Sequence, residues 1–175
     1  MTLTHQRLFF ALWPGEETRR ALWQVSGKLH QVWSGRRMKP DTLHMTLVFL
    51  GDTPVEKVGA LRAIAAAMDI RKFGLTFGHA ACWRHNKVGF LSPDESPPEL
   101  LQLVYGLEDK LEDAGIAFDE RPYKPHLTLL RNTRCTTQVP FESISWNIEE
   151  FVLVSSTTKE TGPVYQLIGR WPLKS

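Results

Sequence analysis

Two short segments of the chain carry the same spacing of a histidine and a threonine. His44 and Thr46 lie in the sequence HMTL, and His126 and Thr128 lie in the sequence HLTL. In a β-strand, residues i and i+2 point to the same face, so each segment would present one imidazole and one hydroxyl together. The apolar residues of each segment would then pack on the opposite face.

The two His/Thr pairs are suited to acid–base chemistry at phosphorus. Imidazole titrates near neutral pH, so one ring can act as a base while the other acts as an acid. Threonine hydroxyls can donate hydrogen bonds to the non-bridging oxygens of a phosphate. Two opposed pairs can therefore hold a phosphodiester, deprotonate a nucleophile on one side and protonate the leaving oxygen on the other. A module that only binds phosphate through these histidines is the alternative from another functional class.

A metal site is the competing use of paired histidines, and we expect none here. The partner of each motif histidine is a threonine, whose hydroxyl is a poor ligand for divalent ions. His79, Cys82 and His85 form a second cluster, but a strand leading into a turn would spread these side chains over both faces. We therefore expect neither a metal nor another cofactor.

Apolar patterning and turn residues predict strands and helices around both motifs. Thr53 and Ser96 each precede a proline and stand three residues before a glutamate, so both predict a capping box at a helix start. Gly115 predicts the end of the helix that follows Ser96. The predicted strands are residues 7–13, 43–50, 73–83, 88–91, 126–131, about 144–156 and 164–171, and the predicted helices are residues 15–33, 54–68 and 97–114.

This order of elements predicts a mixed α/β (α+β) fold in a single domain over residues 1–175. The two motifs lie 82 residues apart, and each has a strand–helix unit beside it. That weak duplication indicates two pseudo-equivalent lobes that face each other across a cleft. No linker rich in Pro, Gly or Ser divides the chain into independent domains.

Composition and charge fit a globular protein that handles a small anionic substrate. Apolar residues make up 42% of the chain, and 21 basic against 19 acidic side chains leave a net charge of +2. A broad nucleic-acid surface would need a larger basic excess, whereas a site for one terminal phosphate would not. No segment approaches the roughly 18 apolar residues of a membrane span. Cys82 and Cys135 lack the spacing of a disulfide framework, so we expect unpaired packing cysteines and a cytoplasmic location.

The sequences around both motifs resemble the 2H phosphoesterase superfamily. LHMTLVFLG at residues 43–51 and RPYKPHLTLLR at residues 121–131 carry the resemblance, which extends to RLFFA at residues 7–11 and EFVL at residues 150–153. Within that superfamily the chain resembles the bacterial RNA 2′,3′-cyclic phosphodiesterases, also called 2′-5′ RNA ligases. The resemblance implies a two-lobed fold with pseudo-two-fold related antiparallel sheets flanking a central cleft and helices on the outside.

The resemblance also implies an activity and the residues that perform it. The activity would be metal-independent opening of an RNA 2′,3′-cyclic phosphate to a 2′-phosphomonoester, with the reverse chemistry joining RNA through a 2′-5′ linkage. His44 and His126 match the two catalytic histidines, and Thr46 and Thr128 match the phosphate-binding threonines. We expect His44 to be the acid toward the departing 3′ oxygen and His126 to be the base toward water.

Arg131 and Phe9 are the remaining site residues that the resemblance implies. Arg131 would contact phosphate or stack on a base, and Phe9 would offer a stacking surface for the nucleobase. We expect the partners to be RNA ends or nucleotides with a 2′,3′-cyclic phosphate, and the protein to be a monomer. A 2H enzyme for 2′-5′ oligonucleotides or another cyclic phosphate would use the same residues, and the sequence leaves that choice open.

Overall fold

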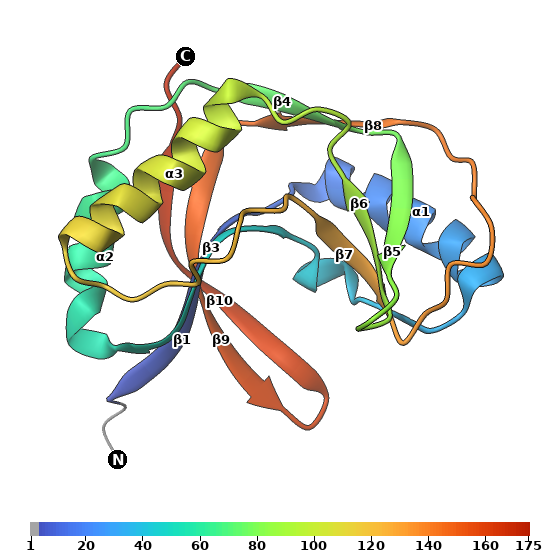
Figure 1. The fold of residues 1–175 in the computed structure, drawn as a ribbon, viewed down its shortest axis with the longest axis horizontal. Coiled ribbons are helices and arrows are strands. Elements are labelled where there is room, and N and C mark those ends of the chain that lie inside the picture. The colour runs from blue at the N-terminus through green and yellow to red at the C-terminus, as the bar shows by residue number, and fades with distance from the viewer. Residues whose placement is uncertain (1–3) are drawn as a thin grey trace.

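Two four-stranded antiparallel sheets form the two lobes of the protein, in a computed structural model that describes residues 4–175 (Figure 1). A third sheet of two strands, β4 (Phe73–Phe77) and β8 (Ile144–Ile148), runs along one side of both lobes. The mixed α/β fold with antiparallel sheets that the sequence predicts is confirmed.

The first sheet has the strand order β10-β9-β1-β3. β1 (His5–Leu12) is central, with β3 (Met45–Pro54) on one side and β9 (Glu150–Lys159) on the other. β10 (Gly162–Pro172) pairs with β9, and the two extend beyond the sheet as a long hairpin (Figure 1). The second half of β1 is buried at every position, as expected for a central strand that is covered on both faces.

The second sheet has the strand order β2-β7-β6-β5. It consists of β2 (Arg36–Arg37), β5 (His79–Trp83), β6 (Val88–Ser92) and β7 (Leu127–Arg131). The hairpin predicted between β5 and β6 is present, with its turn over residues 84–87. The two-residue strand β2 was not predicted, because so short a segment has no periodicity of its own.

The helices interlock the two lobes. α1 (Glu16–Trp33) follows β1 of the first sheet but packs on β7 of the second. α3 (Pro98–Asp113) follows β6 of the second sheet but packs on β3 of the first, beside α2 (Val58–Ala66). One cluster of buried apolar side chains accordingly draws on both sheets. Within residues 4–175, none of the helices is long and apolar enough to cross a membrane.

Two of the predicted strands are each divided between sheets. The predicted strand 73–83 splits at Gly78 into β4 and β5, and the predicted strand 144–156 splits at Glu149 into β8 and β9. The backbone amide of Gly78 donates a hydrogen bond to the Asp94 carboxylate at 2.9 Å instead of joining a sheet. Apolar alternation runs through both divisions, so the sequence pattern does not show them.

Both predicted capping boxes are wrong. Strand β3 runs on through Thr53, whose hydroxyl donates to the carbonyl of Gly51 at 3.0 Å, and α2 begins only after a 3₁₀ turn, η2 (Val55–Lys57). At α3 the N-cap is Pro97, with no side-chain cap. Gly115 ends that helix as predicted, with a positive φ of 67°. Strand pairing to β1 outweighs the local capping preference of Thr53.

The prediction of two unpaired cysteines is also wrong, because Cys82 and Cys135 form a disulfide. Cys82 lies on β5 and Cys135 in the loop after β7, with their Cα atoms 6.0 Å apart. The sheet order β5-β6-β7 brings together residues that are 53 positions apart in the chain. Spacing alone does not reveal such a pair, since the contact depends on which strands are neighbours.

Gly35 lies in the connection between α1 and β2, where it packs against the end of β7. It has a positive φ of 94°, and a Cβ at this position would lie 2.6 Å from the carbonyl oxygen of Arg131. The Thr133 hydroxyl reaches the same connection, lying 2.8 Å from the Ser34 carbonyl oxygen and 3.1 Å from that of Trp33. Only glycine fits this close approach of two backbones.

Gly35→Ala should therefore destabilise the protein by about 2 kcal/mol or more, because it adds both a strained φ and a backbone clash. Gly59→Ala is the matched control, since Gly59 lies in α2 with open space around its Cβ position. That control should raise the free energy of unfolding by about 0.5–1 kcal/mol. Urea denaturation of both variants measures the difference, and equal effects would contradict the assigned role of Gly35.

Candidate active site

The two His/Thr pairs meet in one cavity between the lobes. His44 directly precedes β3 in the first sheet, and His126 directly precedes β7 in the second. Thr46 and Thr128 lie on those strands, two residues further along. All four residues line a single cavity of about 220 Å³. The structure thus brings together residues 82 positions apart in the chain, as the duplicated motif predicts.

Each imidazole is fixed by the same backbone hydrogen bond. His44 Nδ1 lies 2.7 Å from the carbonyl oxygen of Thr42, and His126 Nδ1 lies 2.7 Å from that of Lys124. A carbonyl oxygen can only accept, so Nδ1 carries the proton and Nε2 of the neutral ring is a free acceptor. Each ring is therefore prepared to take up a proton at Nε2 and to release it again.

Local sequence explains why both carbonyls are available. Pro40 opens a short 3₁₀ turn, η1 (Pro40–Thr42), whose last residue supplies the carbonyl to His44. Pro125 precedes His126 and restricts Lys124 to extended backbone, which turns the Lys124 carbonyl toward the ring. A proline thus stands shortly before each motif histidine. Pro40 begins a 3₁₀ turn, whereas Pro125 keeps the preceding residue extended.

Aromatic rings pack closely around His44. Trp13 stacks on the imidazole with ring centroids 5.2 Å apart and an angle of 9° between the planes. Phe9 contacts the ring at 5.0 Å, and Tyr165 meets it edge-on at 5.3 Å. Phe9 is only 5% exposed, so it is a buried side chain that packs against the imidazole. Its predicted role as a stacking surface for a nucleobase stays a prediction.

The packing around His126 is lighter. Trp83 approaches the ring at 4.5 Å and Phe90 at 5.8 Å, both at steep angles. Trp13 and Trp83 thus hold comparable positions beside the two histidines, from opposite lobes. The sequence motifs do not identify either tryptophan as a site residue, because the contacts arise only when the sheets assemble.

The pKa of both histidines is lowered. Burial depresses the pKa of His44 from its ordinary 6.5 to about 4, opposed by the hydrogen bond to Thr42 and aided by the charges of His126 and Arg131. Burial likewise lowers the pKa of His126, opposed by the bond to Lys124 and aided by the charge of Arg131. Both rings are therefore neutral at pH 7 without a ligand.

Arg131 lines the cavity from the end of β7. Its positive charge lowers the pKa of both histidines, which line the same cavity. A cation there is positioned to bind an anion held between the histidines. The predicted phosphate contact of Arg131 has this support and stays a prediction.

Tyr123 ties the second motif to the first. Its hydroxyl donates to the carbonyl oxygen of Thr46 at 3.1 Å, across 77 residues of sequence. Burial raises the pKa of Tyr123 well above its ordinary range, so the hydroxyl stays protonated as a donor. This residue lies within the motif segment, but its reach to the opposite lobe has no signal in the sequence.

A larger cavity of about 1060 Å³ lies elsewhere, between α1 and β8. None of the four motif residues lines it. Of the residues described around the two histidines, only Trp13 also lines this larger cavity. Carboxylates and lysines along its wall do not form an opposed acid–base pair. The chemistry of the lining, and not the volume, therefore identifies the smaller cavity as the candidate site.

Comparisons with known proteins identify the family of the chain. Residues 18–160 match the family model described as the 2′-5′ RNA ligase superfamily. The chain belongs to the 2′-5′ RNA ligase (2H phosphoesterase) superfamily.

Relatives of known name match this superfamily member over nearly its full length. It is 32% identical to the RNA 2′,3′-cyclic phosphodiesterase of Escherichia coli, over 96% of this chain and 97% of that one. It is 30% identical to the Thermus thermophilus protein of the same name, over 96% and 90% of the two chains. The crystal structure of E. coli LigT in apo form matches with a TM-score of 0.88 and 31% identity, covering 99% of this chain and 100% of that one.

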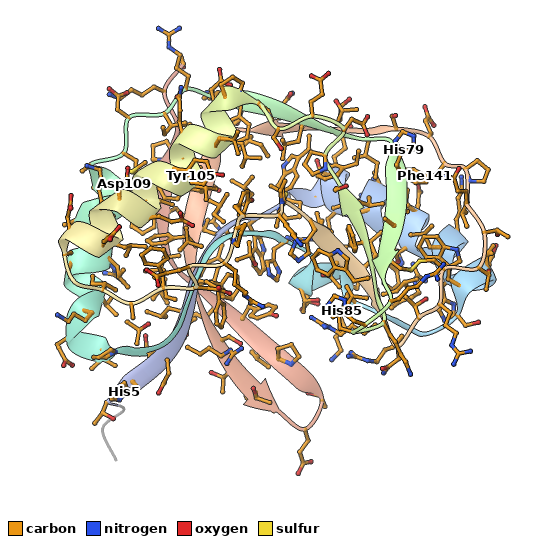
Figure 2. All side chains as sticks on the ribbon, in the orientation of Figure 1. His5, His79, His85, Tyr105, Asp109 and Phe141 are labelled. Carbon is orange, nitrogen blue, oxygen red and sulfur yellow. A yellow bond between two sulfur atoms is a disulfide. The ribbon has the colours of Figure 1, made fainter. Side chains whose placement is uncertain are left out.

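The other histidines of this superfamily member lie away from the cavity. His5 stands at the start of β1, His79 begins β5, and His85 lies in the turn between β5 and β6 (Figure 2). His79 approaches Asp94 at 3.4 Å, and Cys82 between them is in the disulfide. Over residues 4–175, no group of three or more His, Cys, Asp or Glu side chains could hold a metal ion.

The electrostatic account predicts how the two imidazoles titrate. NMR of the ring protons should give a pKa near 4 for His44, and Arg131→Gln should raise the pKa of both His44 and His126 because it removes a nearby positive charge. Arg20→Gln is the matched control, since Arg20 is exposed on α1 and paired with Glu16 at 3.1 Å. A His44 pKa above 6.5 would contradict the account.

Proposed function

We propose that this superfamily member opens the 2′,3′-cyclic phosphate of an RNA end to a 2′-phosphomonoester, without a metal ion. The observation that carries the proposal is the pair of imidazoles in one cavity, each with Nε2 free and a threonine two residues away. The names of the E. coli and T. thermophilus relatives support the same reaction. The crystal structure of E. coli LigT complexed with 3′-AMP, which is 32% identical in sequence, supports a nucleotide as the occupant of this cavity.

In this proposal His126 activates water. The Nε2 atom of His126 takes a proton as the water oxygen bonds to phosphorus, and the bond to the 3′ oxygen breaks on the opposite side. His126 is the less enclosed of the two rings, with two aromatic neighbours against three for His44, so it is the ring that water can reach. This assignment keeps the roles that the resemblance implies.

His44 then supplies the proton that the 3′ oxygen needs to leave. Nε2–H of the protonated ring donates that proton, and the hydroxyls of Thr46 and Thr128 hold the non-bridging oxygens. Because both rings are neutral in the free protein, the proton on His44 enters with the anionic substrate, whose charge raises the pKa of the ring. Product release restores both rings to the neutral form.

The same geometry serves two related reactions. If a ribose 5′-hydroxyl replaces water, His126 deprotonates it and the product is a 2′-5′ linkage. A 2′-5′ oligonucleotide or another cyclic phosphate would engage the same four side chains. RNA-end hydrolysis is our principal proposal because the names of the relatives specify it.

A monomer that acts in the cytoplasm is part of the proposal. The cavity is complete within one chain, since both lobes contribute their motif from the same polypeptide. The cytoplasmic location predicts that Cys82 and Cys135 are kept reduced in the cell although the structure pairs them, because disulfides persist mainly in oxidising surroundings. Counting free thiols in protein isolated under alkylating conditions tests that point.

His44→Ala and His126→Ala should each lower kcat by about 10²–10⁴-fold on a 2′,3′-cyclic phosphate, because each removes one acid–base group. The assay is run in EDTA, with wild type fully active. His79→Ala is the matched control, because His79 is an exposed histidine remote from the cavity and should leave turnover unchanged. Full activity in either motif variant would contradict the mechanism, and loss of wild-type activity in EDTA would contradict its independence of metal.

The pH dependence of kcat/KM tests the protonation states. The reaction needs one ring protonated and the other neutral, so kcat/KM should be highest between the pKa of His44, about 4, and the pKa of His126, which burial holds below its ordinary 6.5. Above pH 6.5 both rings are neutral, and kcat/KM should fall about tenfold for each further pH unit. Initial rates at low substrate concentration measure the profile. A kcat/KM that rises from pH 6 to pH 8 would contradict the lowered pKa values.

A further inference from the structure

The cavity contains a second arginine that the reaction at phosphorus does not use. Arg7, on β1, lines the same cavity as Arg131, and its guanidinium carbon lies 4.8 Å above the ring centroid of Phe49. No carboxylate oxygen lies within 4 Å of its nitrogens in residues 4–175, although Asp52 is its neighbour on β3. Arg7 is therefore an exposed cation held by an aromatic face and available to an anion.

Arg7 belongs to a row of side chains on one face of the first sheet. Ser156 on β9 is the cross-strand partner of Arg7 on β1 and also of Tyr165 on β10. Residues directly opposite each other on paired strands share a face, and all three line the cavity. A guanidinium and two hydroxyls thus face the same space, as in an anion-binding site.

The two arginines enter the cavity from different lobes, Arg7 from β1 of the first sheet and Arg131 from β7 of the second. Arg131 follows His126 by five residues on β7, and the residue five after His44 on β3 is Phe49, over which Arg7 lies. The charge of Arg131 lowers the pKa of both histidines, whereas that of Arg7 acts on neither; both arginines oppose the rise that burial causes in the pKa of Tyr165. No Asp or Glu lines this cavity in the described chain. It therefore offers an anionic ligand one guanidinium from each lobe, with no opposing carboxylate.

RNA that ends in a 2′,3′-cyclic phosphate carries two phosphates on its last nucleotide. One is the cyclic phosphate, and the other is the 5′ phosphodiester that joins this nucleotide to the chain. A 2′,3′-cyclic mononucleotide lacks the second. A cavity of about 220 Å³ has room for no more than one nucleotide, so the arginine from each lobe would meet one of these two groups.

We propose that Arg7, with the hydroxyls of Ser156 and Tyr165, binds the 5′ phosphate of the terminal nucleotide, so that the enzyme prefers an oligonucleotide end over a cyclic mononucleotide. This inference rests on the proposed function and adds to it the group that distinguishes an RNA end from a free nucleotide. Arg7 acts in binding and takes no part in proton transfer.

The test compares three substrates: 2′,3′-cyclic CMP, the same compound with a 5′ monophosphate, and the dinucleotide CpC with a 2′,3′-cyclic phosphate end. Wild type should show a kcat/KM about tenfold or more higher for the second and third than for the first, as expected for a charge-assisted phosphate contact. Arg7→Gln should bring these ratios close to 1, mainly by raising KM for the 5′-phosphorylated substrates. Arg7→Lys should retain part of the preference. Arg20→Gln should retain all of it, because Arg20 is an exposed side chain of α1 outside the cavity.

The outcomes separate this inference from the function on which it rests. Wild-type turnover of all three substrates with equal kcat/KM would overturn the inference and leave the proposed function standing. A preference for the dinucleotide alone would assign the selectivity to the added nucleoside and overturn the phosphate contact. Preserved ratios in Arg7→Gln would overturn the role of Arg7. Turnover of none of the three would overturn the proposed function and the inference with it.

Discussion

A hydrogen bond from imidazole Nδ1 to the carbonyl oxygen two residues earlier determines how both motif histidines can act. At 2.7 Å, this bond fixes ring orientation and tautomer together, in His44 and again in His126. It leaves one nitrogen of each ring, Nε2, to exchange protons with whatever occupies the cavity. The turns before the motifs and the strands after them serve to keep that donor and that acceptor in place.

The two lobes repeat this device but differ in their surroundings. His44 lies among Trp13, Phe9 and Tyr165, whereas His126 has Trp83 and a more distant Phe90. The greater enclosure of His44 lowers its pKa to about 4 and leaves His126 as the ring that water can approach. The acid role proposed for His44 and the base role proposed for His126 rest on this difference in packing around two otherwise similar motifs.

Sequence alone predicts the parts of the site that depend on strand periodicity. His44 and Thr46 share a face because they are two residues apart, and the second copy in the chain predicts the opposing lobe. The contacts that couple the lobes depend on tertiary structure and have no local signal. Tyr123 reaches the carbonyl of Thr46, and the Cys82–Cys135 pair forms across neighbouring strands, only once the sheets are assembled. The capping preference of Thr53 fails for the same reason, because pairing with β1 extends strand β3 through it.

The central claim is that both motif histidines carry their proton on Nδ1 and present Nε2 to the cavity. Long-range ¹H–¹⁵N correlation NMR at pH 8, where both rings are neutral, measures the tautomer of each histidine directly. The account predicts the Nδ1–H form for both His44 and His126, with Nε2 unprotonated. An Nε2–H tautomer in either ring would contradict it, because that ring would have no free acceptor facing the substrate.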